Sequence, residues 1–137
     1  MKSVSKLKKD LDKWFSLYIR LRDATEFEGM VQCFTCGKVA NYKEGMQCGH
    51  FQSRRHHATR WNEQNCQVQC VRCNMFSGSG EQWKFGLNLD AKYGSSTSFD
   101  LHVLSKQTLK MTKVDYEENI RYYKALVNNL KKEKRIA

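Results

Sequence analysis

Apolar side chains recur every three or four residues near both ends of the chain, which is the spacing of a helix that buries one face. The first stripe predicts a helix over about residues 3–25. Its members are Leu7, Leu11, Trp14, Phe15, Tyr18 and Leu21. The second stripe follows Thr112 and Asp115, whose spacing resembles a capping box with Asp in place of the usual Glu, and it predicts a long helix through about Lys134. Its members are Tyr116, Ile120, Tyr123, Val127 and Leu130. Both stripes are expected to form core rather than ligand sites.

The middle of the chain has a different pattern, in which short apolar runs are separated by glycine and polar segments. In chain order it predicts an apolar run at 31–35, a strand at 45–51, a polar and basic loop at 52–64 and a strand at 65–69. A helix that carries Asn74 is then predicted from Cys70. This helix breaks near 78–80 and restarts at Glu81, with Gly94 as its C-cap. A short helix capped by Ser98 or Asp100 then leads to the last helix.

These elements predict one α+β domain over residues 1–137, in which a metal-stabilised centre is flanked by N- and C-terminal helices. Its parts are an N-terminal helix at 1–28, the centre at 29–94 and a basic helical region at 95–137. Hydrophobic residues make up 40% of the chain and aromatic residues 12%, which is a globular composition. The sequence has neither a run of about 18 apolar residues that could span a membrane nor a secretory signal. We therefore expect a cytosolic protein.

Positive charge is concentrated at the two ends of the chain, whose formal net charge is +10. Residues 1–22 hold seven Lys/Arg against two Asp, and residues 106–137 hold nine Lys/Arg against four Asp/Glu. The segment between them holds eight residues of each sign. Both ends are therefore candidates for binding phosphates, and DNA is the expected partner. The alternative is that Lys-rich helices merely present a solvated face.

Two C-x-x-C pairs, Cys33 with Cys36 and Cys70 with Cys73, predict a structural zinc site, because four thiolates at this spacing form a tetrahedral cage. Six cysteines could instead form three disulfides, but the spacing and a reducing compartment favour metal. Cys48 and Cys66 are left over. They could form a second site, or they could be small buried residues of short strands, which is the interpretation we favour.

One histidine and two asparagines fall on the predicted strand, strand and helix in an order that suits phosphodiester hydrolysis. His50 is on the first strand, Asn65 on the second and Asn74 on the helix. A neutral histidine can take a proton from water at pH 7. An amide oxygen can hold a magnesium ion, and a second amide can fix the histidine through hydrogen bonds. The two zinc-binding pairs on either side favour this functional interpretation over a structural histidine.

Several short motifs together resemble one known family. They are Ile19–Asp23, Cys33–Gly37, Cys48–Phe51, Arg60–Asn65, Gln69–Asn74 and the pattern that ends at Tyr93–Gly94. In order and spacing they are similar to the NinG/Rap recombination proteins of lambdoid and related phages, and the central part resembles the HNH, or ββα-metal, nuclease motif in a variant that ends in Asn. The resemblance covers about residues 7–94.

The resemblance implies a zinc-braced ββα-metal (HNH-type) centre and a structure-specific endonuclease that cleaves branched DNA, such as Holliday junctions and D-loops, in phage recombination. It also implies a protein that acts in the cytoplasm of a bacterial host. By this analogy His50 is the general base, Asn65 orients it or the strand, and Asn74 binds a catalytic Mg²⁺ or Mn²⁺. A two-fold dimer and other recombination proteins are candidate partners, because a junction presents two scissile strands.

One position departs from the family pattern. Many HNH sites carry a metal-binding acidic residue immediately before the first histidine, and this chain has Gly49 there. Candidates for the second ligand are His56, His57, Glu63, Glu81 or water. In the alternative arrangement His50 is itself a metal ligand and another histidine is the base.

The loop between the predicted strands is basic and lies next to His50 in the sequence. Arg54, Arg55 and Arg60 are suited to contacting phosphate, and Lys84 could reach a neighbouring phosphate. The alternative is a solvated loop without a role in binding. Three other functions remain open at this stage: a sequence-specific or nicking HNH enzyme that acts on plain duplex, a zinc-dependent DNA-binding module without catalysis, and a small recruiting protein.

Overall fold

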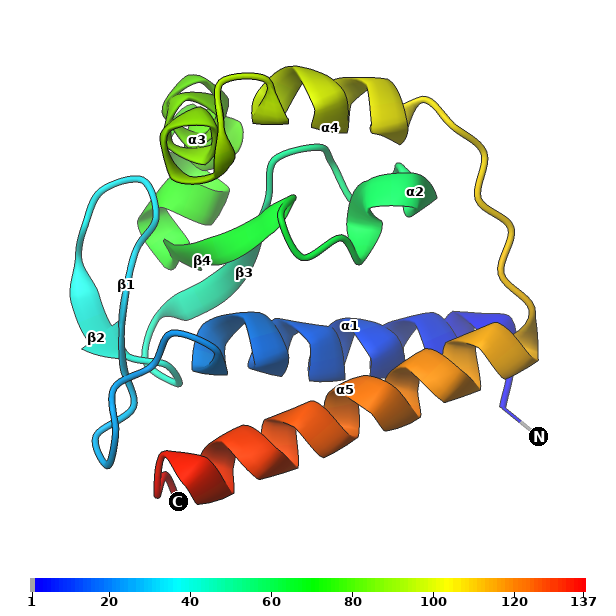
Figure 1. Ribbon diagram of the computed structural model, residues 1–137, viewed down its shortest axis with the longest axis horizontal. Coiled ribbons are helices and arrows are strands. Elements are labelled where there is room, and N and C mark those ends of the chain that lie inside the picture. Colours follow the sequence, from blue (N-terminus) through cyan, green and yellow to red (C-terminus); the bar gives the residue numbers. More distant parts are fainter. Residues whose placement is uncertain (1) are drawn as a thin grey trace.

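Two long helices lie side by side along one edge of the molecule and run in the same direction, and the other elements pack above them (Figure 1). The computed structural model describes residues 2–137, apart from the side chains of residues 78 and 79. Its elements are α1 (Val4–Leu21), β1 (Met30–Gln32), β2 (Val39–Asn41), β3 (Met46–His50), α2 (His57–Arg60), β4 (Cys66–Cys70), a π-helical turn η1 (Arg72–Phe76), α3 (Gly78–Tyr93), α4 (Thr97–Ser105) and α5 (Lys113–Glu133). None of these helices is long and apolar enough to cross a lipid bilayer.

Helix α1 begins at the N-cap Ser3, whose side chain accepts a hydrogen bond from the backbone N–H of Lys6. Of the predicted apolar stripe, Leu7, Leu11, Phe15 and Leu21 are buried, and Trp14 and Tyr18 are partly buried against the same cluster. Ile19, which was not predicted, is buried as well. The helix ends at Leu21, earlier than the predicted residue 25. Three backbone carbonyls at its C-terminus bind the ammonium group of Lys134 instead of continuing the helical ladder. They belong to Leu21, Arg22 and Ala24, at 2.8–2.9 Å.

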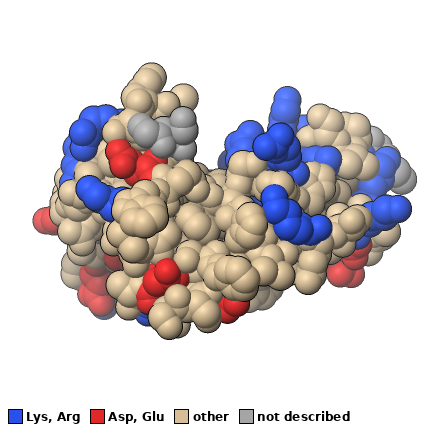
Figure 2. All heavy atoms as spheres, turned by 90° about the horizontal axis from the view of Figure 1, so that it is seen from above, with Lys and Arg blue, Asp and Glu red and all other residues tan. Residues whose placement is uncertain are grey.

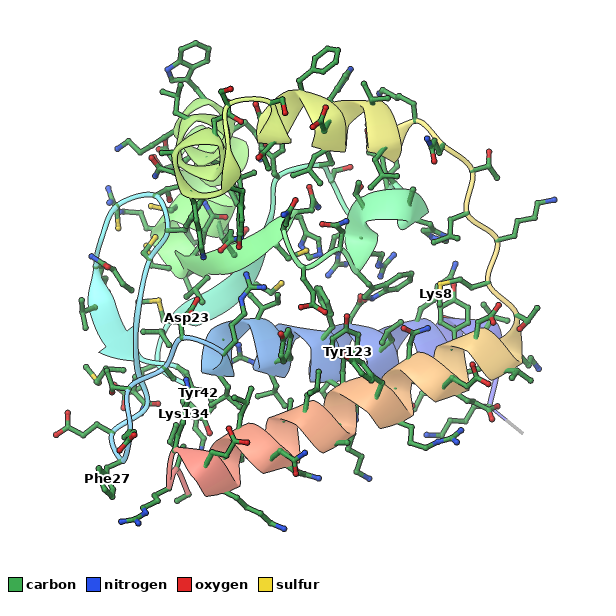
Figure 3. All side chains as sticks on the ribbon, in the orientation of Figure 1. Lys8, Asp23, Phe27, Tyr42, Tyr123 and Lys134 are labelled. Carbon is green, nitrogen blue, oxygen red and sulfur yellow. The ribbon has the colours of Figure 1, made fainter. Side chains whose placement is uncertain are left out.

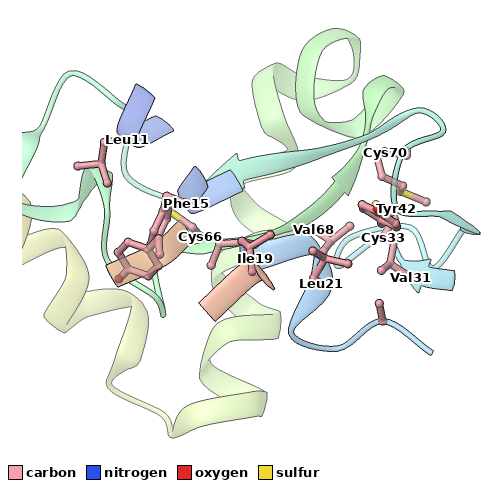
Figure 4. Close-up of a cluster of buried hydrophobic side chains, with 14 of the residues drawn as sticks. Leu11, Phe15, Ile19, Leu21, Val31, Cys33, Tyr42, Cys66, Val68 and Cys70 are labelled. Atoms are coloured by element: carbon pink, nitrogen blue, oxygen red, sulfur yellow. The ribbon is translucent and has the colours of Figure 1, made fainter. Parts of the chain in front are cut away.

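Helix α5 confirms the predicted capping box. Thr112 Oγ1 accepts from the backbone N–H of Asp115, and Asp115 Oδ2 accepts from the backbone N–H of Thr112. Its buried face packs on α1, where the ring of Tyr123 meets Phe15 edge-on with centroids 4.9 Å apart (Figures 3 and 4). The two helices that flank the predicted centre therefore pack on each other as well.

The small sheet of β3 and β4 has a hydrophobic cluster on each side. The strands pair antiparallel, with Gly49 opposite Gln67 and His50 opposite Cys66. Alternate residues of β4, including Cys66 and Val68, join the main cluster with α1 and α5 (Figure 4). The second cluster consists of Phe85, Leu89 and Leu101, with Phe34 and Phe51 packed against it. The sheet is thus held between α1 and the pair α3 and α4 (Figure 1).

The predicted order of strand, loop, strand and helix is confirmed, with three local differences. The sequence did not indicate β2, a three-residue strand that pairs with β1 and exposes 57% of Val39. The helix after Cys70 is a π-helical turn, and the break that follows it falls at extended Ser77, so α3 begins at Gly78 and not at the predicted Glu81. Helix α4 has Ser96 as its N-cap residue, so the predicted caps Ser98 and Asp100 were wrong. Ser98 instead binds Asp90, through its backbone N–H at 2.7 Å and its hydroxyl at 2.8 Å.

Removing the ammonium group of Lys134 should destabilise the protein, because three carbonyls at the end of α1 would lose a charged donor. For Lys134→Met we expect the free energy of unfolding to fall by about 1.5–3 kcal/mol, the scale of hydrogen bonds to a charged group. Urea unfolding followed by circular dichroism measures this change. The control is Lys132→Met, at an exposed position of the same helix end. Equal stability losses in the two variants would contradict a specific role for Lys134.

Candidate functional site

Four cysteine thiols from three parts of the chain converge beside the sheet. Cys33 follows β1, Cys36 lies in the next turn, Cys70 ends β4 and Cys73 lies in η1. Their sulfur atoms all lie within 4.8 Å of one another, and those of Cys36 and Cys70 are 3.7 Å apart. A zinc tetrahedron with bonds of about 2.3 Å has edges of about 3.8 Å. The group could therefore hold a zinc ion, as the spacing predicted.

The electrostatics of these thiols also suit a cation. Burial opposes ionisation of Cys33, but hydrogen bonds from the backbone around Cys36 and Cys70 lower the pKa of its thiol to about 6. Burial raises the pKa of Cys73 to about 12. Four thiols this close cannot all ionise without a cation, and Zn²⁺ supplies the missing charge. All six cysteines are free thiols in the structure, which therefore does not show the alternative of three disulfides.

The imidazole of His50 is held at the end of β3 by one hydrogen bond from a defined ring nitrogen. Nε2 lies 3.0 Å from the backbone carbonyl oxygen of Arg60, which can only accept. The proton of the neutral ring is therefore on Nε2, and the lone pair is on Nδ1. Burial lowers the pKa of His50 below its ordinary value of 6.5, and the charge of Arg54 lowers it further. A neutral imidazole at pH 7 follows from this environment.

Asn65 holds the loop between β3 and β4. Its side chain is fully buried and binds the backbone at the start of the loop and in α2. Nδ2 donates to the carbonyl oxygens of Gln52 at 3.1 Å and Thr59 at 3.0 Å, while Oδ1 accepts from the N–H of Gln52 at 2.8 Å. Thr59 directly precedes Arg60, whose carbonyl binds His50. These contacts fix the backbone that orients the imidazole.

Asn74 lies on η1, one residue after Cys73 of the four-cysteine group, so its position is tied to that group. Its Nδ2 donates to Gln47 Oε1 on β3 at 2.7 Å. Asn74 and His50 are 24 positions apart in the sequence, yet both line one pocket of about 470 Å³. Gln47, Cys48 and other residues from α1 and the loop complete its walls. The structure therefore brings the predicted histidine and the predicted metal-binding asparagine to one cavity.

The backbone at Gly49 has no room for the acidic residue that many HNH sites carry there. A Cβ atom at this position would lie 2.0 Å from Oε1 of Gln69 on the paired strand. Gln69 is itself buried and fixed, because its Nε2 donates to Thr35 Oγ1 at 3.1 Å and to the carbonyl of Gly80 at 2.9 Å. Packing across the sheet thus explains why this position differs from the HNH pattern that the sequence resembles.

The suggested replacements for that acidic ligand lie elsewhere. Glu63 accepts hydrogen bonds from the hydroxyls of Tyr18 at 2.9 Å and Tyr123 at 3.0 Å, and it joins the loop to α1 and α5. Glu81 accepts from the hydroxyl of Ser77. Histidines 56 and 57 face two other pockets, at the start of α2. Within the described part of the chain, none of the four lines the pocket of His50 and Asn74.

Asp12 on α1 is the acidic residue that does line this pocket, and the sequence analysis did not find it. Its carboxylate accepts from Arg60 Nε at 3.1 Å and Nη2 at 2.5 Å, and from Trp61 Nε1 at 2.9 Å. Asp12 therefore anchors the residue whose carbonyl orients His50. Forty-eight positions separate Asp12 from Arg60, so no local pattern could have indicated the contact.

The predicted DNA-binding residues fall into two groups. Arg54, Arg55 and Lys84 are exposed, and Arg54 lines the pocket. The guanidinium group of Arg60 is instead paired with Asp12 and has only 15% of its side-chain surface exposed. Figure 2 shows Lys and Arg gathered on two lobes, with mostly uncharged surface between them. Contact of these four residues with DNA stays a prediction.

Comparison with known proteins gives one match. Over residues 1–133 the chain matches the protein family described as the bacteriophage lambda NinG protein. No curated protein and no solved structure matches it significantly. The match extends beyond the segment that carried the sequence resemblance, through the basic C-terminal helix.

Proposed function

Because the chain belongs to the family of the bacteriophage lambda NinG protein, we propose that it is a metal-dependent endonuclease that cleaves branched DNA intermediates of recombination. Membership confirms the resemblance to the NinG/Rap proteins that was predicted from the sequence. Branched DNA as the substrate rests on that resemblance, and the chemistry rests on the pocket.

One observation carries the proposal: His50 and Asn74 line the same pocket. The lone pair on Nδ1 of His50 can take the proton of a water molecule as that water attacks phosphorus. Arg60 holds the opposite ring nitrogen, so the ring keeps its orientation while it accepts the proton. Because burial keeps the imidazole neutral, the base is available at pH 7.

The oxygen donors of this pocket suit a hard divalent cation. Asn74, Gln47 and Asp12 bring amide and carboxylate oxygens to its walls, and Mg²⁺ typically takes one or two protein oxygens and keeps several waters. Asn74 would hold the ion, with water or a neighbouring oxygen in place of the acidic residue that Gly49 excludes. The bound ion would supply positive charge for the phosphate and the leaving oxygen.

Substrate binding follows from charge rather than from base recognition. The chain carries a formal charge of +10, and exposed Arg54 lies at the pocket itself. Phosphate contacts of this kind are insensitive to base sequence, so affinity should fall steeply with salt and selectivity should follow DNA shape. A branched DNA offers both the phosphates for such contacts and a distinct shape for such selectivity.

The test is a cleavage assay on labelled four-way junction, flap and linear duplex DNA. Protein with its zinc content verified is assayed without added cation, with Mg²⁺ and with Mn²⁺. We expect cutting that depends on added cation and is faster on junction and flap than on duplex. Equal rates on all three substrates would favour a duplex nuclease. Binding without any cutting would indicate a DNA-binding or recruiting protein and would overturn the proposal.

A further inference from the structure

A second group of side chains that could bind a metal includes His50 and shares no residue with the four-cysteine site. Cys48, His50 and Cys66 each bring one ligand atom, and these atoms all lie within 4.8 Å of one another. The sheet causes this convergence. Cys48 and His50 are two residues apart on β3 and so point to the same face, and Cys66 lies opposite His50 on β4.

Two of the three groups, His50 and Cys66, are held by the same loop. The carbonyl oxygen of Arg60 accepts from His50 Nε2 at 3.0 Å and from Cys66 Sγ at 3.5 Å. Cys66 is fully buried, whereas Cys48 and His50 line the pocket of about 470 Å³. A metal ion can therefore reach the group from the pocket, and water on the pocket side can complete its coordination.

Two thiols and an imidazole form a soft donor set. Such a set suits Zn²⁺ or Cd²⁺ and disfavours Mg²⁺, which needs oxygen ligands. Two cysteines and one histidine with an open fourth position are also an established zinc arrangement. The soft donors of this group thus differ in kind from the oxygen donors of Asn74 and Gln47 in the same pocket.

We propose that Cys48, His50 and Cys66 form a second metal site, which binds zinc and, when occupied, switches off His50 as a base. Binding releases the two thiol protons to solvent and forms two metal–sulfur bonds and one metal–nitrogen bond. The inhibitory part of this inference rests on the proposed nuclease function, but the existence of the site does not.

Occupancy removes the base whichever ring nitrogen binds. Zinc on Nδ1 takes the lone pair that would accept the proton of water. Zinc on Nε2 displaces the proton now donated to Arg60, and the neutral ring then carries its one proton on Nδ1. In both cases Nδ1 no longer accepts a proton. Excess zinc should therefore inhibit cutting even when Mg²⁺ is abundant.

Metal counting tests the site without any DNA. The reduced full-length protein is titrated with Cd²⁺, and the thiolate-to-metal absorption is followed together with bound metal per chain after gel filtration. We expect two equivalents for the parent protein and one for Cys48→Ala and for Cys66→Ala. Ser16→Ala, which alters the same pocket without removing a ligand, should still bind two. Circular dichroism confirms that each variant is folded.

One equivalent in the folded parent protein, or a second equivalent retained in both cysteine variants, would overturn the site. If Cys66→Ala fails to fold, the metal count is made instead on two other variants, Cys48→Ala, at a half-buried position, and His50→Gln. The inhibition of cleavage by zinc is then measured for each protein relative to its own rate without added zinc. The zinc concentration that halves cutting should rise at least about a hundredfold in Cys48→Ala, since even outer-shell losses weaken metal binding 10- to 100-fold. If the parent protein cuts no DNA, the proposed nuclease function is refuted. The metal count still tests whether the second site exists.

Discussion

Replacing Cys70 with serine is expected to leave most of the chain unfolded under conditions in which the parent protein is folded. Cys70 is 3% exposed, ends β4 and has its sulfur 3.7 Å from that of Cys36, so the change removes a buried thiol from the group that could hold zinc. Structural zinc contributes about 10–16 kcal/mol in small zinc-dependent folds. A whole domain of ordinary size is stable by only about 5–15 kcal/mol. Loss of the ion therefore removes a free energy as large as the total stability.

The measurements are far-UV circular dichroism and zinc content per chain. The matched control is Cys66→Ala, which alters an equally buried cysteine on the same strand outside the four-cysteine group. It should stay folded, keep the metal of the four-cysteine group and lose stability on the scale of an ordinary core substitution, about 1–3 kcal/mol. A Cys70→Ser protein with a parental spectrum and melting temperature would show that the four thiols do not brace the fold.

Features that depend on nearby residues could be predicted from the sequence. The two apolar stripes gave the long helices, Thr112 and Asp115 gave the start of α5, and the C-x-x-C spacing gave a thiol cluster that the structure confirms. Each of these signals lies within one or two turns of chain. Local rules are reliable there because the interacting groups are neighbours in sequence.

Features that depend on distant residues could not be predicted. Asp12 holds the loop at Arg60 from 48 positions away, and Lys134 ends α1 from the opposite end of the chain. The side chain of Gln69 explains why position 49 is glycine, but only the register of β3 with β4 brings the two together. A sequence pattern shows which residues carry chemistry. The tertiary packing decides which of them share a pocket.

Replacing His50 with alanine is expected to lower the rate of junction cleavage by about a hundredfold or more, the usual contribution of a general base. DNA binding should change little, because His50 is half-buried whereas Arg54 of the same pocket is exposed. Cutting rates are measured under single-turnover conditions, and binding is measured in parallel. His56→Ala and His57→Ala are the controls, since these histidines face other pockets. A loss confined to either control would identify that histidine as the base instead.

The pH dependence separates a base from a structural histidine. The lowered pKa of His50 means that more than half of the folded protein carries the neutral ring at pH 6.5, so cleavage should still exceed half of its maximum there. Arg54→Ala removes a positive charge that lowers this pKa, and it should shift the acidic limb of the rate profile to higher pH. The stability of the fold falls at acidic pH, as the cleavage rate does. The reason is that the unfolded chain binds the His50 proton more tightly than the folded chain, so stability is lost as the pH falls below 6.5. Circular dichroism at each pH must therefore show a folded protein. An acidic limb that Arg54→Ala leaves in place, in protein that stays folded, would mean that another group limits the rate and that His50 is not the base.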